Sequence, residues 1–270
     1  MFKECNAMTT PKIIDFHTHP YLSSEEFYCF YPDQFIPSSA QCMEDIKKAG
    51  ISHVCGSVIL KKKYEGGFDH IRSCNDRAFE LKKILGDFYT PGFHIHPDFV
   101  KRSLEEIELR RRQGFGLIGE LVPYMHGWSD YSRKDLGELL EAAGHFHMAV
   151  SFHTVEREPD EISKMIENHP NVTFIAAHPG DREQYLLHLD RIKKYENIYL
   201  DLSGTGIFRY GLIAHGVKTV GSERLIFGTD YPICNPRMYV QAVYQEPISE
   251  KDIDNIFYNN ARRIIDSFLS

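Results

Sequence analysis

The sequence predicts an α/β protein folded as a (β/α)8 TIM barrel, and three observations predict it. Eight short apolar runs rich in Val, Ile and Phe follow one another along the chain. Amphipathic stretches separate these runs, as expected for parallel strands joined by helical crossovers. The length of 270 residues suits one such barrel, so we expect a single domain over residues 1–270. A doubly wound sheet is the alternative, although eight strands would make it wide for this chain.

The expected strands are too short for helices and end in polar loops. They cover Ile13–Phe16, His53–Leu60, Phe88–Ile95, Gly116–Val122, Met148–Phe152, Val172–Ala177, Ile198–Leu202 and Leu225–Phe227.

Glycines that can cap a helix C-terminus follow the first three expected helices, at Gly50, Gly86 and Gly114. The last expected helix opens with Ser249 and Glu250, an N-cap residue and an acidic first turn. The expected helices are Met43–Ala49, Asn75–Leu85, Ser103–Gln113, Lys134–Ala143, Glu161–Asn168, Arg182–Lys194, Gly211–Val220 and Ser249–Phe268.

The composition excludes several classes of protein. Hydrophobic residues make up 42% and charged residues 26%, an ordinary globular mixture. The net charge of −7 disfavours a nucleic-acid partner, because an acidic surface repels phosphate backbones. We see no secretion signal, no apolar run that spans a bilayer and no C-x-x-C pair among the six cysteines. The sequence therefore predicts a cytoplasmic protein with free thiols and no membrane partner.

Metal-competent side chains stand where the expected strands end. In a barrel of this kind, the chemistry lies at the C-terminal ends of the strands. His17 and His19 end the first strand, and single residues end four later ones: Glu120, His153, His178 and Asp230. Side chains alternate along a strand, so we expect Gly116, Ile118 and Glu120 to share the inner face of strand four, and Val172, Phe174, Ala176 and His178 that of strand six.

Neutral imidazoles and carboxylates are ligands for zinc, manganese or iron. We therefore expect one or two divalent ions, with zinc as the first expectation. The predicted ligands are His17, His19, Glu120, His153, His178 and Asp230.

The order H-x-H, Glu, His, His, Asp on successive strand ends resembles the amidohydrolase superfamily, within it the amidohydrolase-related (family 2) and TatD-like groups. The resemblance runs from Ile13–His19 to Asn259–Arg263. The TatD likeness lies in Gly92, His96-Pro97 and Ile118-Gly119-Glu120, and it implies a Glu120 bridge between two metals. If Glu120 does not bind, one ion is held by His17, His19, Asp230 and a later histidine. After Glu120 the sequence departs from the TatD pattern.

The resemblance implies a metal-dependent hydrolase that acts on a small substrate, with an amide, ester or lactone bond, through an activated water. Asp230 accepts the proton from this water, and His178 is the second catalytic candidate as an acid, base or orienting group. One alternative is a metal-dependent decarboxylase of a small carboxylic acid. Others are a TatD-like phosphodiesterase or nuclease and a non-catalytic binding barrel.

Side chains on the neighbouring loops are the candidates for substrate contact. An arginine there could hold a carboxylate, as a decarboxylase requires. The long aromatic loop Pro20–Ala40 is expected to wall the pocket, and its aromatic part at 21–36 is compatible with a homo-oligomer. The substrate-binding candidates are His94, His96, His126, Trp128, Arg157 and Arg209.

Overall fold

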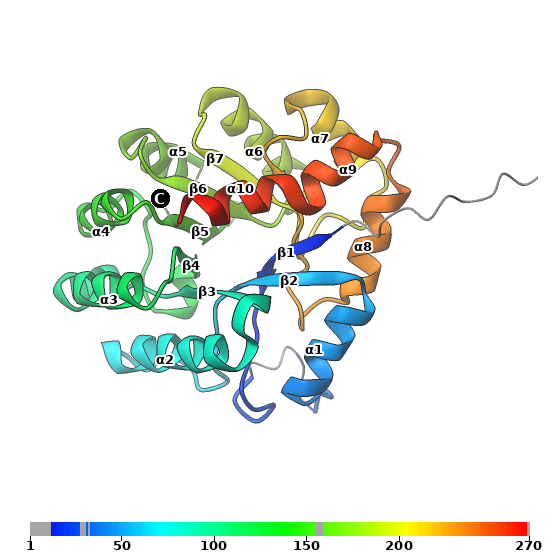
Figure 1. Ribbon diagram of the computed structural model, residues 1–270. Helices are drawn as coiled ribbons and strands as arrows, with labels where there is room; N and C mark the ends of the chain where they lie inside the picture. Colours follow the sequence, from blue (N-terminus) through cyan, green and yellow to red (C-terminus); the bar gives the residue numbers. More distant parts are fainter. Residues whose placement is uncertain (1–11, 28–30, 32, 155–158, 269–270) are drawn as a thin grey trace, which may run out of the picture.

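The structure, a computed structural model, describes residues 12–27, 31, 33–154 and 159–268. Eight parallel strands pair in chain order and curve into a barrel with helices around it, which confirms the predicted fold (Figure 1). The strands are β1 Ile13–Thr18, β2 Ile51–Gly56, β3 Tyr89–Phe93, β4 Leu117–Leu121, β5 Ala149–His153, β6 Thr173–Ala177, β7 Ile198–Asp201 and β8 Leu225–Ile226.

Hydrogen bonds between β1 and the chain that follows β8 close the barrel. The Phe16 amide donates to the Phe227 carbonyl at 2.9 Å, and the Asp230 amide donates to the His17 carbonyl at 2.8 Å. The buried Asp15 carboxylate accepts from the Thr229 amide at 3.0 Å and from its hydroxyl at 2.6 Å. The seam therefore places the first and last predicted ligand segments side by side.

The expected helices form, with shifted boundaries. They are α1 Ser39–Lys48, α2 Phe68–Leu85, α3 Val100–Arg112, α4 Lys134–His145, α5 Pro159–Asn168, α6 Arg182–Lys194 and α7 Leu212–Val220. Short 3₁₀ turns lie at η1 Gly86–Phe88, η2 Pro97–Phe99 and η3 Pro123–Met125.

Helix α8, Pro236–Gln245, was missed by the sequence analysis. Its start signals are Asn235, whose side chain accepts from the amides of Arg237 and Met238, and Pro236 at the first helical position.

The expected helix at 249–268 is divided. A π-helical turn, η4 Asn255–Asn259, separates α9 Glu250–Asp254 from α10 Asn260–Ser267. The Ile256 carbonyl accepts from the Phe227 amide at 2.9 Å, which ties this segment to the end of β8. Helix α10 lies across one end of the barrel (Figure 1), where Phe268 packs against Gly116 at the start of β4. The segment therefore covers the N-terminal end and leaves the opposite end for the site.

The expected inner faces of strands four and six were wrong. Leu117 of β4 and Ile175 of β6 belong, with Ala149, to the apolar cluster that packs on α10. Ile118 and Phe174, which were expected to face inward, belong instead to the layer beneath the surrounding helices. The alternation fails because it holds only within a regular ladder. The register of β4 shifts between Ile118 and Leu121, and His178 lies beyond the last residue of β6 with a φ of 68°.

A buried charged network joins α2 and α3. Glu106 and Arg110 are both fully buried, and their side chains are 2.5 Å apart. The buried Asn75 amide donates to Glu106 at 3.2 Å and to the His94 carbonyl at 2.9 Å. The network thus fixes the chain just after β3 to two helices.

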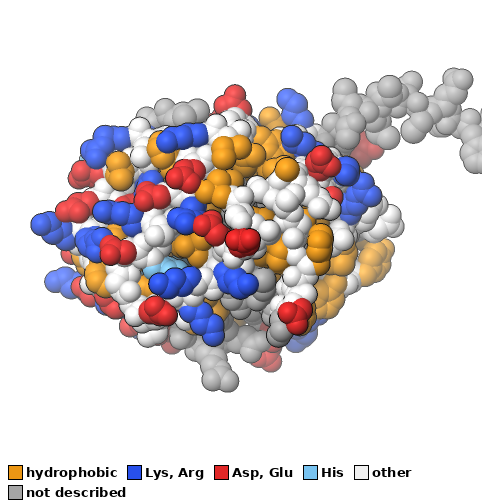
Figure 2. Space-filling view, turned by 90° about the horizontal axis from the view of Figure 1, so that it is seen from below, with side chains coloured by type: hydrophobic (Ala, Val, Ile, Leu, Met, Phe, Trp, Pro, Cys, Tyr) orange, Lys and Arg blue, Asp and Glu red, His pale blue; other side chains and the backbone are white. Residues whose placement is uncertain are grey.

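On the part of the chain that the structure describes, no helix combines the length and apolar character needed to cross a bilayer. The cysteines described at 42, 55, 74 and 234 carry free thiols, as expected, while Cys5 and Cys29 lie outside the described residues. Basic and acidic side chains alternate over the face shown in Figure 2.

We expect Glu106→Gln to lower the free energy of unfolding by about 1.5–3 kcal/mol, because the Arg110 guanidinium loses its buried charged partner and keeps Asp76, 2.5 Å away. Chemical denaturation followed by circular dichroism measures this. Glu108→Gln on the same helix is the control, since the Glu108 side chain is 59% exposed and lies 3.8 Å from Arg112. Equal stability of the two variants would contradict the structural importance of the network.

Candidate metal centre

Two histidines and a carboxylate converge where β1 and β8 end. The Nε2 atoms of His17 and His19 are 3.2 Å apart. The Asp230 carboxylate lies 3.2 Å from His19 Nε2 and 3.7 Å from His17 Nε2. All three residues are buried, and their ligand atoms lie close enough together to hold one ion.

Glu120 lies between these groups and two further histidines. Its Oε1 atom is 2.8 Å from His153 Nδ1 and 3.5 Å from His178 Nε2. Its Oε2 atom is 3.5 Å from His17 Nε2 and 3.8 Å from His19 Nε2. Each oxygen of one carboxylate therefore faces a different pair of imidazoles. The structure thus brings all six predicted ligands into one cluster.

Neighbouring groups orient the imidazoles. His17 Nδ1 lies 2.5 Å from Asp201 Oδ2, and the Ser203 amide donates to Asp201 Oδ1 at 2.6 Å. His19 Nδ1 donates to the Ser57 carbonyl at 3.0 Å, and His178 Nδ1 is 2.9 Å from the Ser203 hydroxyl. Each contact occupies Nδ1 and turns Nε2 toward the cluster.

The sequence analysis missed Asp201 and Ser203. A signal was present, since Asp201 ends the seventh strand, just as the predicted ligands end other strands.

Two glycines allow the close packing at the site. A Cβ atom on Gly228 would lie 2.5 Å from Asp201 Oδ1 and 2.8 Å from His17 Cβ. Gly204 has a φ of 57° and lies directly against the His178 ring. A side chain at either position would displace an imidazole or the aspartate that orients it.

Burial alone would raise the pKa of the Glu120 carboxyl, but the charges of His17 and His153 and their hydrogen bonds hold this pKa well below its usual value. The pKa of Asp230 is likewise lowered, because a hydrogen bond from His19 and the charge of His178 outweigh burial. Both side chains are therefore carboxylates, the form that binds a cation.

A cavity of about 470 Å³ opens over the cluster. His19, Glu120, His153, His178 and Asp230 line its floor, and the described lining residues include no lysine or arginine. Its walls include Ile59 after β2, Tyr124 and Met125 after β4, and Phe208 after β7. We call it the active cavity below.

Only some residues of the aromatic loop Pro20–Ala40 line the active cavity. Tyr31 and Gln34 line the active cavity. Tyr21 and Phe27 are instead buried against each other, with ring centroids 4.9 Å apart. Tyr28 and Phe30 lie outside the described residues.

The histidines after β3 lie behind the wall of the active cavity. His94 Nε2 donates to the Val58 carbonyl at 2.9 Å. His96 contacts the His126 carbonyl through Nε2 at 2.8 Å and accepts from the Asp98 amide through Nδ1, so both of its nitrogens are used within the protein. Burial lowers the pKa of His94 to about 4, which keeps the ring neutral.

The remaining substrate-binding candidates are dispersed. Trp128 is buried with its ring 5.5 Å from that of Tyr131. Arg209 is exposed and donates to the Gly180 carbonyl at 3.0 Å. Arg157 lies outside the described residues. His126 lines a second cavity beside the active one.

No curated protein matches this chain. Solved structures match its fold at low identity. An uncharacterized TIM-barrel protein from Bordetella bronchiseptica aligns with a TM-score of 0.76 and 17% identity, covering 96% of this chain and 100% of that one. A dihydroxybenzoic acid decarboxylase from Polaromonas sp. JS666, with bound manganese and the inhibitor 2-nitroresorcinol, aligns with a TM-score of 0.72 and 15% identity, covering 95% and 97%.

A candidate 2-pyrone-4,6-dicarboxylic acid hydrolase from Pseudomonas putida aligns with a TM-score of 0.68 and 15% identity, covering 95% of this chain and 98% of that one. At these identities the alignments establish the fold. A family model described as amidohydrolase matches residues 14–266, nearly the whole chain. The chain therefore belongs to the amidohydrolase family of metal-dependent enzymes.

Proposed function

We propose that this protein is a metal-dependent hydrolase that cleaves an amide, ester or lactone bond in a small substrate, with two divalent ions in the active cavity. The position of Glu120 carries the proposal. Its two oxygens face separate pairs of imidazoles, which is the arrangement that a carboxylate shared by two ions requires. A single ion would leave one of these pairs without a ligand role.

The donor set fits two ions. His17, His19 and Asp230 would hold one, His153 and His178 the other, and Glu120 both. Imidazole and carboxylate donors suit zinc, manganese and iron, with zinc as our first expectation. A bridge by Glu120 would match the arrangement that the resemblance to the TatD-like group implies. The phosphodiesterase activity of that group stays a separate prediction, disfavoured for polymeric substrates by the net charge of −7.

Divalent ions held there would lower the pKa of water to about 7 and polarise the carbonyl of the substrate. Asp230 lies at the cavity floor with its carboxylate ionised, so it would accept the proton from the attacking water and pass it to the leaving group. His178, held by Ser203, would keep its Nε2 atom directed at the reacting centre.

The described lining of the active cavity offers no lysine or arginine to a substrate carboxylate. A decarboxylase must hold a substrate carboxylate, and a cation is the expected partner. Among the described lining residues the charged side chains other than histidine are acidic. The resemblance to a manganese-containing decarboxylase keeps decarboxylation as the second candidate, with Arg157 or Arg209 as the cation that such a reaction would need.

We expect the purified protein to bind two divalent ions per chain and Glu120→Gln to bind at most one, because an amide cannot replace a bridging carboxylate. Inductively coupled plasma mass spectrometry measures the ratio. Glu80→Gln, at an exposed position on α2, is the control and should keep two ions. One ion in the unchanged protein would refute the binuclear proposal.

We expect Asp201→Asn to weaken divalent-ion affinity about 10–100-fold, since His17 loses the charged partner that orients it. Competition with a fluorescent chelator measures the affinity. The matched control is Asp190→Asn on helix α6, whose carboxylate is 70% exposed and lies 3.1 Å from Lys193. An unchanged affinity in Asp201→Asn would rule out this role.

We expect Asp230→Asn to lose about 10²–10⁴-fold in kcat, because the proton acceptor is removed. A panel of small amides, esters and lactones provides the substrate, and metal content is measured alongside. Full activity with normal metal content would refute the role of Asp230.

A second panel of small carboxylic acids, monitored for release of CO2, tests decarboxylation. Turnover of the acids alone, with none of the amides, esters or lactones, would favour the decarboxylase over the hydrolase.

A further inference from the structure

A second cavity adjoins the active cavity. Its volume is about 330 Å³, and it is lined by residues 59–64, His70, Cys74 and residues 124–126. We call it the side cavity. Ile59, Tyr124 and Met125 line both cavities, so these three residues form the partition between them. The Tyr124 ring contacts His153 of the cluster, with centroids 5.4 Å apart. The side cavity thus begins one side chain away from the reacting centre.

The two cavities carry opposite charge. Lys61, Lys62 and Lys63 line the side cavity, and its described lining residues include no Asp or Glu. Lys62 is 3.7 Å from Glu65, an acid that lies outside this lining. Within the described part of the chain, no acidic side chain forms an ion pair with Lys61 or Lys63. The three lysines are exposed, and they give the described lining of the side cavity a net positive charge.

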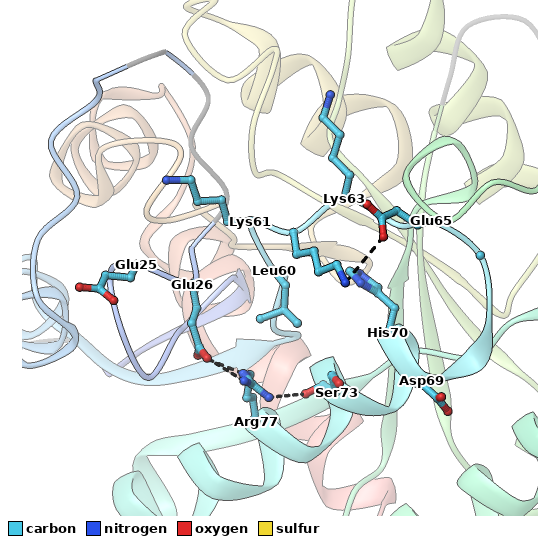
Figure 3. A pocket seen from close by; sticks show the side chains of 12 residues that line it. Glu25, Glu26, Leu60, Lys61, Lys63, Glu65, Asp69, His70, Ser73 and Arg77 are labelled. Carbon is cyan, nitrogen blue, oxygen red and sulfur yellow. Dashed lines mark hydrogen bonds and ion pairs between the residues drawn. The ribbon is translucent and has the colours of Figure 1, made fainter.

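A third and outer cavity of about 640 Å³ shares the three lysines and is shown in Figure 3. Its charges are balanced, because Glu25, Glu26, Glu65 and Asp69 also line it. Figure 3 shows Arg77 paired with Glu26, and no dashed line reaches Lys61 or Lys63. Lys62 is paired with Glu65 at 3.7 Å. The same three lysines therefore adjoin acidic side chains in the outer cavity and none in the described lining of the side cavity.

His126 adds a buried imidazole that forms no hydrogen bond with a described residue. It is 6% exposed and lines the side cavity. Its backbone carbonyl contacts His96, but its imidazole forms no hydrogen bond with any described residue. The nearest rings are those of His94 at 5.0 Å and Tyr64 at 6.0 Å. Burial and the neighbouring histidines lower its pKa, so the ring is neutral and has one N–H to donate.

We propose that the side cavity binds an anionic group of the substrate, a carboxylate or a phosphate, while the scissile bond lies over the metal cluster. This assignment rests on the proposed hydrolase function and names its substrate class: a small molecule with a neutral reacting end and an acidic tail. Lys61 and Lys63 attract the anion, and the His126 imidazole donates a hydrogen bond to it. Ile59, Tyr124 and Met125 contact the part of the substrate that joins the two ends.

The direct test measures binding of inorganic phosphate and of glutarate to the purified holoenzyme by isothermal titration calorimetry. The two probes separate a phosphate-binding from a carboxylate-binding cavity. We expect at least one probe to bind, and Lys61→Ala/Lys63→Ala to weaken it about tenfold or more, since each exposed charge contributes roughly fivefold at the dielectric constant of water. Added salt should weaken binding in the unchanged protein. Lys101→Ala/Lys218→Ala removes two exposed lysines elsewhere and should bind as the unchanged protein does.

A second variant addresses the buried histidine. His126→Leu should weaken the same probe, and His126→Gln should restore part of the affinity because its amide can donate. Thermal unfolding verifies that both variants fold. A lysine pair variant that binds both probes as tightly as the unchanged protein would overturn the proposal, as would an unchanged protein that binds neither.

Two readouts separate this proposal from the hydrolase proposal. Metal content and the titrations are measured on the same samples, and the titrations are repeated after chelation. Lysine-dependent anion binding that persists after chelation supports the side cavity on its own, whereas a purified protein that holds no divalent ion refutes the metal centre and leaves the side cavity standing. Where esters are cleaved, the ratio of kcat/KM for mono-4-nitrophenyl glutarate to that for 4-nitrophenyl acetate should fall in the lysine pair variant. An unchanged ratio would count against a substrate tail in this cavity.

Discussion

The seam between β1 and the chain after β8 is the constraint on which both the barrel and the site depend. The Asp230 amide donates to the His17 carbonyl across this seam, so the backbone hydrogen bond that closes the barrel also joins two of the residues proposed to share an ion. Asp15 strengthens it by accepting two hydrogen bonds from Thr229, and burial raises the pKa of its carboxyl to about 7. The backbone hydrogen bonds that close the barrel therefore also bring two of the proposed metal ligands together.

The cluster would be costly without a cation. Two carboxylates and four imidazoles are packed together, with carboxylate–imidazole distances of 2.8 to 3.8 Å. Burying charged groups in this way is unfavourable unless they are paired. Asp201 and Ser203 hold the imidazoles so that their free nitrogens point inward rather than toward other partners. The protein thus stabilises in advance a geometry that bound ions can use without rearrangement.

Charge is divided between the two adjoining cavities. The active cavity contains the carboxylates of Glu120 and Asp230, whereas the side cavity contains lysines and a neutral histidine. The carboxylates of the active cavity would be neutralised by the proposed ions, whereas the lysines of the side cavity would attract an acidic group of a substrate.

The sequence by itself determined the architecture and the six residues of the cluster. Eight apolar runs alternating with helices predict a barrel of parallel strands. Because these strands run in the same direction, the polar residues at their C-terminal ends lie at one end of the barrel. The missed helix α8 and the divided C-terminal helix reflect local choices, such as the π-helical turn that presents the Ile256 carbonyl to Phe227, which no periodic pattern records.

Only the tertiary structure decided how the cluster is arranged. The alternation that predicted an inward Glu120 and His178 assumed regular strands, yet both residues reach the site through irregular backbone, at the register shift of β4 and beyond the end of β6. The roles of Asp201 and Ser203, the placement of each Glu120 oxygen and the partition between the cavities depend on contacts between segments far apart in the chain. Such contacts are set by packing across the barrel, which spacing along one sequence does not encode.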